Sequence, residues 1–127
     1  MKGVYIQKAL VVNEDQRRKI IEIQNGQMDI KNMKVLEVKE DSYLGGHWHT
    51  YPEIMYILKG EAKHYIMSNL DTGEKEVFDL KEGDVVFRTG RIVHGGWFTK
   101  GSIIIDGAAS TYISRDFNDI VVEGFKE

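Results

Sequence analysis

The stretch His47-Trp48-His49-Thr50-Tyr51-Pro52-Glu53 holds two histidines two positions apart, followed four positions later by a glutamate. Alternate side chains of a β-strand point to the same face, so His47 and His49 would lie together. Two imidazoles on one face can bind one metal ion, and a carboxylate from Glu53 on the next strand would add a ligand. Imidazole nitrogen with carboxylate oxygen suits a divalent ion such as Mn, Fe, Ni, Cu or Zn.

A His-x-His pair alone is weak evidence for a metal site, because surface histidines on a strand are usually solvated. Two further features strengthen it. Gly60 closes the segment after six more residues, and His94 stands in a second segment that begins with Gly83. The pattern therefore predicts a metal site built from two separate parts of the chain.

The composition bounds what the protein can be. Its 127 residues, 42% hydrophobic and 29% charged, predict one globular domain over 1–127 with a single core. A net charge of −3 disfavours nucleic acid as a partner, because phosphate binding depends on clustered Lys and Arg. The absence of cysteine excludes disulfides, a thiol nucleophile and a thiolate zinc site. With no signal peptide and no run near ~18 apolar residues, we expect a cytoplasmic protein without a membrane partner.

The chain as a whole is a series of short β-branched and aromatic runs separated by turn residues. Strands are expected over 4–12, 19–24, 30–38, 47–50, 53–58, 61–68, 75–80, 85–88, 92–98, 101–106 and 120–122, with a loop over 41–46. A helix over 14–23 is the alternative for the second run. Thirteen glycines and one proline fit a turn-rich chain. This pattern predicts an all-β sandwich or jelly roll with little helix.

Together the two glycine-bounded segments resemble the cupin superfamily over about residues 30–106. The first segment, with His47, His49, Glu53 and Gly60, matches the spacing of the first cupin motif. In the second, His94 follows Gly83 by eleven positions, as in the second motif. The usual leading Gly, Pro, Gly and closing Asn are replaced here by Asp41, Thr89, Arg91 and Phe98.

That resemblance implies a double-stranded β-helix barrel in which one divalent metal is held by four ligands: His47, His49, Glu53 and His94. Such a set leaves one or two coordination positions open for Lewis-acid chemistry. If 47, 49, 53, 55 and 57 share a face, Met55 and Ile57 line the barrel below the metal and Trp48 points away. Cupins usually pair through strands, which implies a homodimer that buries Ile54, Tyr56 and Leu58.

A weaker resemblance concerns the flanks, 15–20, 109–112 and 115–117. They are similar to cupins that epimerise or isomerise nucleotide-linked 4-keto-sugars in surface-polysaccharide pathways. In that class a His takes a proton next to the ketone and a Tyr or second His returns it, in some members without a metal. Because this chain keeps all four ligands, a metal-assisted isomerase or epimerase is predicted, with His49, Glu53 and Tyr65 as its catalytic residues.

Candidates for binding a small, carbohydrate-derived substrate are Tyr43, Lys63, Arg88 and Trp97, although packing or solvation would explain each equally well. On the strand over 61–68, Lys63 and Tyr65 would share one face, and the inward face is left open. Two other functions remain. The same ligands suit a non-heme metal dioxygenase, and a non-catalytic sugar- or metal-binding cupin needs no reaction at all.

Overall fold

The structure of the protein is a computed structural model that describes residues 1–111, 120–121 and 125. Those residues form twelve β-strands and no helix, so none of their segments is a helix able to span a membrane. One five-stranded sheet has the order β1 (Val4–Lys8), β9 (Asp84–Arg88), β6 (Glu53–Lys59), β11 (Ile103–Ala108), β4 (Asn32–Glu37). The other has the order β12 (Ile120–Val121), β5 (Ser42–Trp48), β10 (Ile92–Phe98), β7 (Glu61–Asn69), β8 (Lys75–Lys81).

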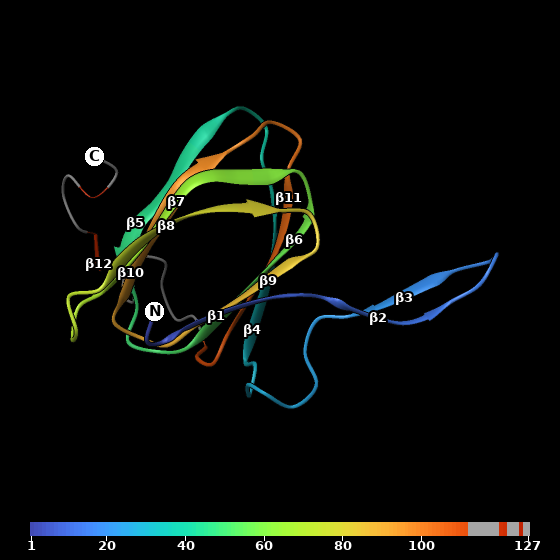
Figure 1. Ribbon diagram of the computed structural model, residues 1–127, viewed down its shortest axis with the longest axis horizontal. Helices are drawn as coiled ribbons and strands as arrows, with labels where there is room; N and C mark the ends of the chain where they lie inside the picture. The colour runs from blue at the N-terminus through green and yellow to red at the C-terminus, as the bar shows by residue number, and fades with distance from the viewer. Residues whose placement is uncertain (112–119, 122–124, 126–127) are drawn as a thin grey trace.

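The two sheets curve round a shared interior (Figure 1). Consecutive strands such as β5 and β6, or β9 and β10, lie in different sheets, and all neighbouring pairs are antiparallel. The core between the sheets includes the almost fully buried side chains of Met55, Ile57, Tyr65, Met67 and Ile104. The all-β jelly-roll prediction is therefore confirmed, as is the apolar lining proposed for Met55 and Ile57.

The N-terminal segment differs from the prediction. The strand expected over 4–12 is two strands, because β1 joins the sheet beside β9, while β2 (Leu10–Glu14) pairs, within the described part of the chain, with β3 (Lys19–Glu22) alone. The alternative of a helix over 14–23 is wrong. Asp15 Oδ1 accepts hydrogen bonds from the amides of Arg17 and Arg18 at 2.8 and 3.1 Å. Such local side-chain bonds favour a turn over a helix.

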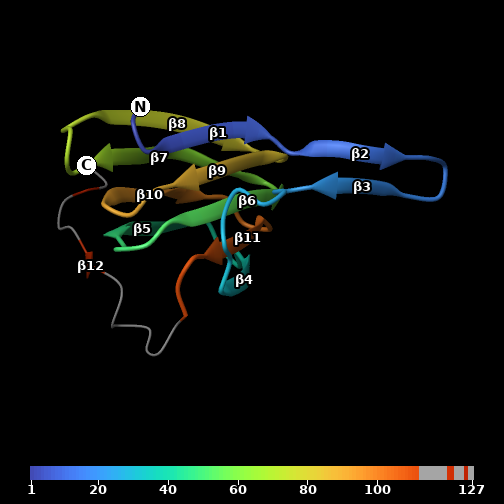
Figure 2. The same cartoon turned by 90° about the horizontal axis from the view of Figure 1, so that it is seen from below.

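The β2–β3 hairpin extends away from the barrel (Figure 2). The side chains exposed on it include apolar ones, namely Leu10, Val11, Val12, Ile20 and Ile21.

The loop predicted over 41–46 is instead the first part of strand β5. Gly45 and Gly46 have φ angles of 105° and 84°, which favour glycine. Their position coincides with a bulge, where the pairing of β5 with β10 shifts between His94 and Gly95. The bulge lets the strand continue into His47 while keeping its backbone close to β10.

A second bulge, in β7, changes which side chains point inward. Pairing with β8 shifts between Ala62 and Tyr65, and His64 has a φ of 49°. Lys63 and His64 are consequently both exposed, while Tyr65 is buried. The prediction that Lys63 and Tyr65 share a face is therefore wrong, because the bulge breaks the simple alternation of the strand.

The outer face of β6 is covered by the chain itself. Ile54 and Tyr56 are each 3% exposed and form a second core cluster with Val85. Partly buried side chains from outside the barrel, including Ile23 and Met28, pack against it. The expectation that a partner subunit buries Ile54 and Tyr56 is thus wrong. Only Leu58 of that set is exposed.

Candidate functional site

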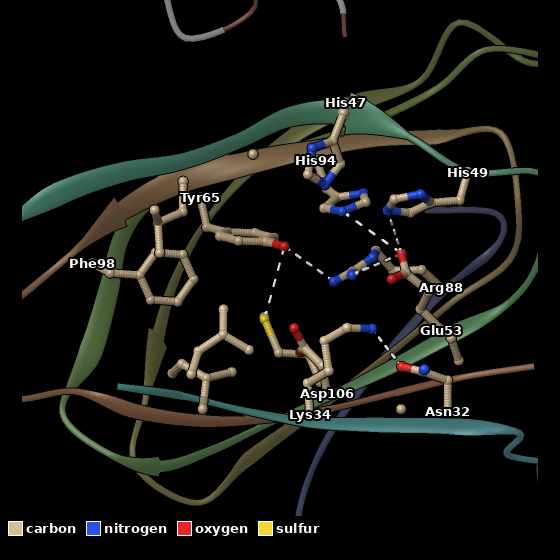
Figure 3. A pocket seen from close by; sticks show the side chains of 17 residues that line it. Asn32, Lys34, His47, His49, Glu53, Tyr65, Arg88, His94, Phe98 and Asp106 are labelled. Atoms are coloured by element: carbon tan, nitrogen blue, oxygen red, sulfur yellow. Dashed lines mark hydrogen bonds and ion pairs between the residues drawn. The ribbon is translucent and has the colours of Figure 1, made fainter. Parts of the chain in front are cut away.

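Three histidines from the β5–β10 region meet inside the barrel. His47 on β5 lies opposite His94 on β10, and His49 follows the end of β5. The ring centroid of His47 is 4.7 Å from that of His49 and 4.8 Å from that of His94. One ring nitrogen from each of the three lies within 4.8 Å of the others. All three rings face one cavity (Figure 3).

Glu53 reaches these histidines from the opposite sheet. Its Oε1 is 3.3 Å from His49 Nε2 and 3.7 Å from His94 Nε2. The same oxygen is 3.2 Å from Nη2 of Arg88, which lies directly opposite Glu53 where β6 pairs with β9. The carboxylate is therefore shared between a buried guanidinium and two imidazoles.

The ring nitrogens of His47, His49 and His94 form a group that could hold a divalent metal ion. With bonds of about 2.1 Å, two ligands at right angles are about 3.0 Å apart and two opposite ligands about 4.2 Å. The distances from Glu53 to His49 and His94 lie within that range. The histidine nitrogens, within 4.8 Å of one another, need only a small contraction. A cluster that could hold a metal is therefore present, and the choice among Mn, Fe, Ni, Cu and Zn is left open by the ligand types.

The local contacts of the histidines orient their rings for this role. His94 Nδ1 is 2.9 Å from the carbonyl oxygen of Ile92. A carbonyl can only accept, so Nδ1 carries the proton and Nε2 presents its lone pair. Burial, and then the positive charge of Arg88, lower the pKa of His94 well below its ordinary value, which keeps the ring neutral. His49 Nδ1 is 3.4 Å from the hydroxyl of Tyr51.

Tyr65 and Arg88 form the wall of the cavity next to Glu53. Arg88 Nη1 donates a hydrogen bond of 3.0 Å to the hydroxyl oxygen of Tyr65, and that hydroxyl lies 3.9 Å from the sulfur of Met55. Burial raises the pKa of Tyr65 far above its ordinary value, so the phenol stays protonated. Since a thioether is a weak acceptor, the Tyr65 proton can turn to a ligand oxygen.

The remaining substrate-binding candidates do not line this cavity. Lys63 is exposed, with its Nζ 3.5 Å from Glu61 Oε1. Tyr43 and Trp97 face each other across β5 and β10 as a T-shaped pair with centroids 5.5 Å apart. Of the predicted substrate residues, the structure brings only Arg88 to the histidines.

Arg91 illustrates one departure from the cupin motif. It stands where glycine is usual and has a φ of 54°. The strain of that backbone is offset by contacts of its side chain, which pairs with Asp71 at 2.7 Å and lies over the Trp48 ring at 5.1 Å. Arg91 is therefore engaged outside the cavity.

Sequence reasoning missed Asp106 on β11. Its side chain lines the cavity, and its Oδ1 is buried without a hydrogen-bond partner among the described residues. Burial raises the pKa of Asp106 to about 6, against the lowering effect of Arg88. A signal was present: alternation along β11 places Asp106 on the same face as the fully buried Ile104.

The cavity has a volume of about 190 Å³. A second hollow of about 550 Å³ adjoins it, and Glu53 and Arg88 line both. The outer hollow is also bordered by Tyr5 and Phe87. Tyr112 and the segment 115–117, part of the weaker resemblance, lie outside the described residues.

No protein-family model matches the chain, and no curated protein matches it in sequence. Solved structures do match. The sugar 3,4-ketoisomerase QdtA from Thermoanaerobacterium thermosaccharolyticum, in complex with TDP, superposes with a TM-score of 0.78 at 19% identity, covering 99% of this chain and 93% of its own. The 3'-monoepimerase ChmJ from Streptomyces bikiniensis, in complex with dTDP-quinovose, gives 0.79 at 13% identity over 94% of this chain and 69% of its own.

A third match is the dTDP-4-dehydrorhamnose 3,5-epimerase from Sulfolobus tokodaii, with a TM-score of 0.79 and 13% identity, covering all of this chain and 81% of its own. At such identities the likeness concerns the fold. The prediction of a cupin-type double-stranded β-helix, similar to nucleotide-sugar ketoisomerases and epimerases, is confirmed.

Proposed function

We propose that this protein is an isomerase or epimerase that moves a proton next to a carbonyl group of a carbohydrate derivative, preferably a nucleotide-linked keto-sugar. The observation that carries the proposal is the meeting of a carboxylate, neutral imidazole and protonated phenol in one small cavity (Figure 3). Those are the groups that proton transfer next to a ketone requires. The fold shared with sugar isomerases and epimerases supports the same conclusion.

Glu53 is the base in this proposal and His49 its proton relay. Glu53 Oε1 takes the proton from the carbon beside the carbonyl. Since His49 Nε2 is 3.3 Å away, it can receive that proton and return it to the sugar whenever that nitrogen is not bound to a metal ion. Return to the same carbon from the other face gives an epimer. Return to the former carbonyl carbon gives the isomeric ketone, when the hydroxyl on the deprotonated carbon also gives its proton to the former carbonyl oxygen.

Tyr65 stabilises the oxygen on which negative charge develops. Its raised pKa makes it a lasting hydrogen-bond donor rather than a donor of the proton itself. Arg88, bonded to both Tyr65 and Glu53, fixes the distance between donor and base. A fixed donor of this kind contributes on the order of 100-fold or more to the rate.

A divalent ion held by His47, His49 and His94, with Glu53 as the fourth ligand, would polarise the carbonyl as a Lewis acid. The three histidine nitrogens lie within 4.8 Å of one another and could hold such an ion. Glu53, which Arg88 also holds, can serve as ligand at rest and as base during proton transfer.

The sizes of the two hollows assign the sugar and the nucleotide of a nucleotide-sugar to different places. About 190 Å³ admits the reacting part of a sugar but not a nucleotide. The outer hollow of about 550 Å³ begins at Glu53 and Arg88 and is bordered by two aromatic rings, those of Tyr5 and Phe87. We place the nucleotide there, with the sugar pointing inward.

The test is proton exchange in deuterated water. TDP-4-keto-6-deoxyglucose, the compound bound in a QdtA structure, is incubated with the metal-supplemented protein, and the signals of hydrogens beside the ketone are followed by NMR. The wild type and the control Glu37→Gln, an exposed carboxylate on β4, should exchange at equal rates. Glu53→Gln should be slower by about 100-fold or more.

Failure of exchange with this compound and with a panel of other keto-sugars would contradict the proposal. Oxygen uptake in the presence of a substrate would favour the dioxygenase instead. A ligand-induced rise in melting temperature without exchange or oxygen uptake would favour a binding module.

We also propose a homodimer, through a surface other than the one expected from the sequence. Exposed apolar side chains gather on the β2–β3 hairpin, with Leu10 59% and Val11 44% exposed. A two-stranded hairpin without a covering layer is only marginally stable in water. A second copy of the chain would cover it. Light scattering that gives a monomer mass at micromolar concentration would contradict this.

A further inference from the structure

Two buried polar atoms, on residues that line the cavity, take no part in the proton transfer described above. They are Nε of Arg88 and Oδ1 of Asp106, and neither has a hydrogen-bond partner among the described residues. Arg88 is 4% exposed, and both side chains line the same cavity. Their charges act on each other, since Arg88 lowers the pKa of Asp106.

Asp106 lies across the cavity from the histidines. It comes from β11, in the sheet opposite β5 and β10. Figure 3 shows it on the far side of the cavity from the three imidazoles, with Arg88 and Tyr65 between. A ligand whose carbonyl lies at the histidines would therefore extend toward Asp106.

Buried polar groups in folded proteins are nearly always hydrogen-bonded, because an unpaired one loses its hydrogen bonds to water and forms none in exchange. One N–H donor and one carboxylate acceptor in the same cavity call for a group that can both accept and donate. A hydroxyl group does so. The N–H of Arg88 would donate to its oxygen, and its proton would be donated to Asp106.

The charges in the cavity argue against an ionic ligand group at this place. Arg88 is already paired with Glu53 at 3.2 Å. Lys34, opposite Asp106 where β11 pairs with β4, is hydrogen-bonded to Asn32. A carboxylate or phosphate would be repelled by the negative charge of Asp106, and an ammonium by the positive charge of Arg88. A neutral hydroxyl is repelled by neither.

We propose that Arg88 Nε and Asp106 Oδ1 form a subsite that binds a hydroxyl group of the substrate, with Asp106 on the side of the cavity opposite the histidines. The inference rests on the proposed function for the position of the carbonyl. It adds that the substrate is a hydroxyketone whose hydroxyl and carbonyl span the cavity. A ketone without that hydroxyl should bind about tenfold to hundredfold more weakly, because charge-assisted hydrogen bonds are lost.

The experiment compares two small ketones, dihydroxyacetone and acetone, which differ only in hydroxyl groups. The protein is labelled with ¹³C at its aspartate carboxyl carbons, and Asp106→Asn assigns the Asp106 signal. Dihydroxyacetone should shift that signal and lower the pKa of Asp106 from about 6, because a donated hydrogen bond favours the charged form. Acetone should leave both unchanged.

Affinities from the same titrations complete the test. Asp106→Ala should bind dihydroxyacetone at least about tenfold more weakly than wild type, while Glu37→Gln should match wild type. Asp106→Asn, whose amide oxygen can still accept, should lie between. Equal effects of the two ketones on the Asp106 signal, or no effect of either, would overturn the proposal. This outcome is independent of the proton-exchange assay, since binding of the hydroxyl is measured without turnover.

Discussion

Replacing Arg88 with methionine tests the polar network on which the site depends. Arg88 is 4% exposed and bonds Glu53 at 3.2 Å and Tyr65 at 3.0 Å. Methionine keeps the length of the side chain but leaves the Glu53 carboxylate, itself only 14% exposed, without its cation. Breaking a buried pair in this way costs about 3–5 kcal/mol. Against a total stability of about 5–15 kcal/mol, the urea midpoint should fall by roughly a fifth or more.

The double variant Arg88→Met/Glu53→Gln identifies the cause of that loss. If an uncompensated charge is responsible, neutralising Glu53 should restore about 1–3 kcal/mol relative to Arg88→Met alone. Lys8→Met is the control, because Lys8 pairs with Asp84 at 2.7 Å but is 66% exposed. Its cost should stay below about 1 kcal/mol. An Arg88→Met variant no less stable than Lys8→Met, or a double variant that recovers nothing, would refute the reasoning.

Three further predictions concern the metal, the pH dependence and the surface. His49→Ala should lower metal content after reconstitution with Mn²⁺ or Zn²⁺, measured by elemental analysis, whereas the exposed His64→Ala should not; equal occupancy contradicts the metal site. The pKa of Asp106 is raised to about 6 in the folded state. The folded state therefore holds the Asp106 proton more tightly than the unfolded state. The stability that this gives is full below the unfolded-state pKa of about 4 and is lost as the pH rises through 6. Asp106→Asn should accordingly be more stable than wild type at neutral pH by up to about 3 kcal/mol, with no such gain below about pH 4 in urea unfolding; a difference independent of pH contradicts this. Val11→Glu on the hairpin should shift the mass in light scattering from dimer to monomer, and an unchanged dimer would place the interface elsewhere.

Local spacing explains why the sequence predicted where the histidines lie. His47 and His49 are two residues apart on a strand, so strand geometry alone brings them together. Bringing His94 to them needs only that its strand pair with theirs, and the register places His94 opposite His47. Glu53 then needs a short crossing to the other sheet. Each of these steps spans only a few residues, so an error in strand register or in the assignment of a face has little length over which to grow.

Residues further from the motif could not be placed in this way. A bulge between Ala62 and Tyr65 moves Lys63 to the surface, and simple alternation cannot foresee it. The separation of the hairpin from the barrel depends on which strand pairs with which, and pairing between distant segments leaves no local pattern. Asp106 was visible as a charged residue at an inward position, but its importance appears only when the cavity around it is known.

Glu53 shows most clearly what the structure adds to the motif. From its spacing alone it would be a metal ligand like the histidines. In the folded chain its Oε1 lies as close to Arg88, at 3.2 Å, as to His49, at 3.3 Å. A carboxylate bound to a guanidinium donates less electron density to a metal, yet remains in position to accept a proton from a carbon acid. Under the proposed function Glu53 would therefore act as both ligand and base, and Arg88, a residue outside the motif, would determine the balance between the two roles.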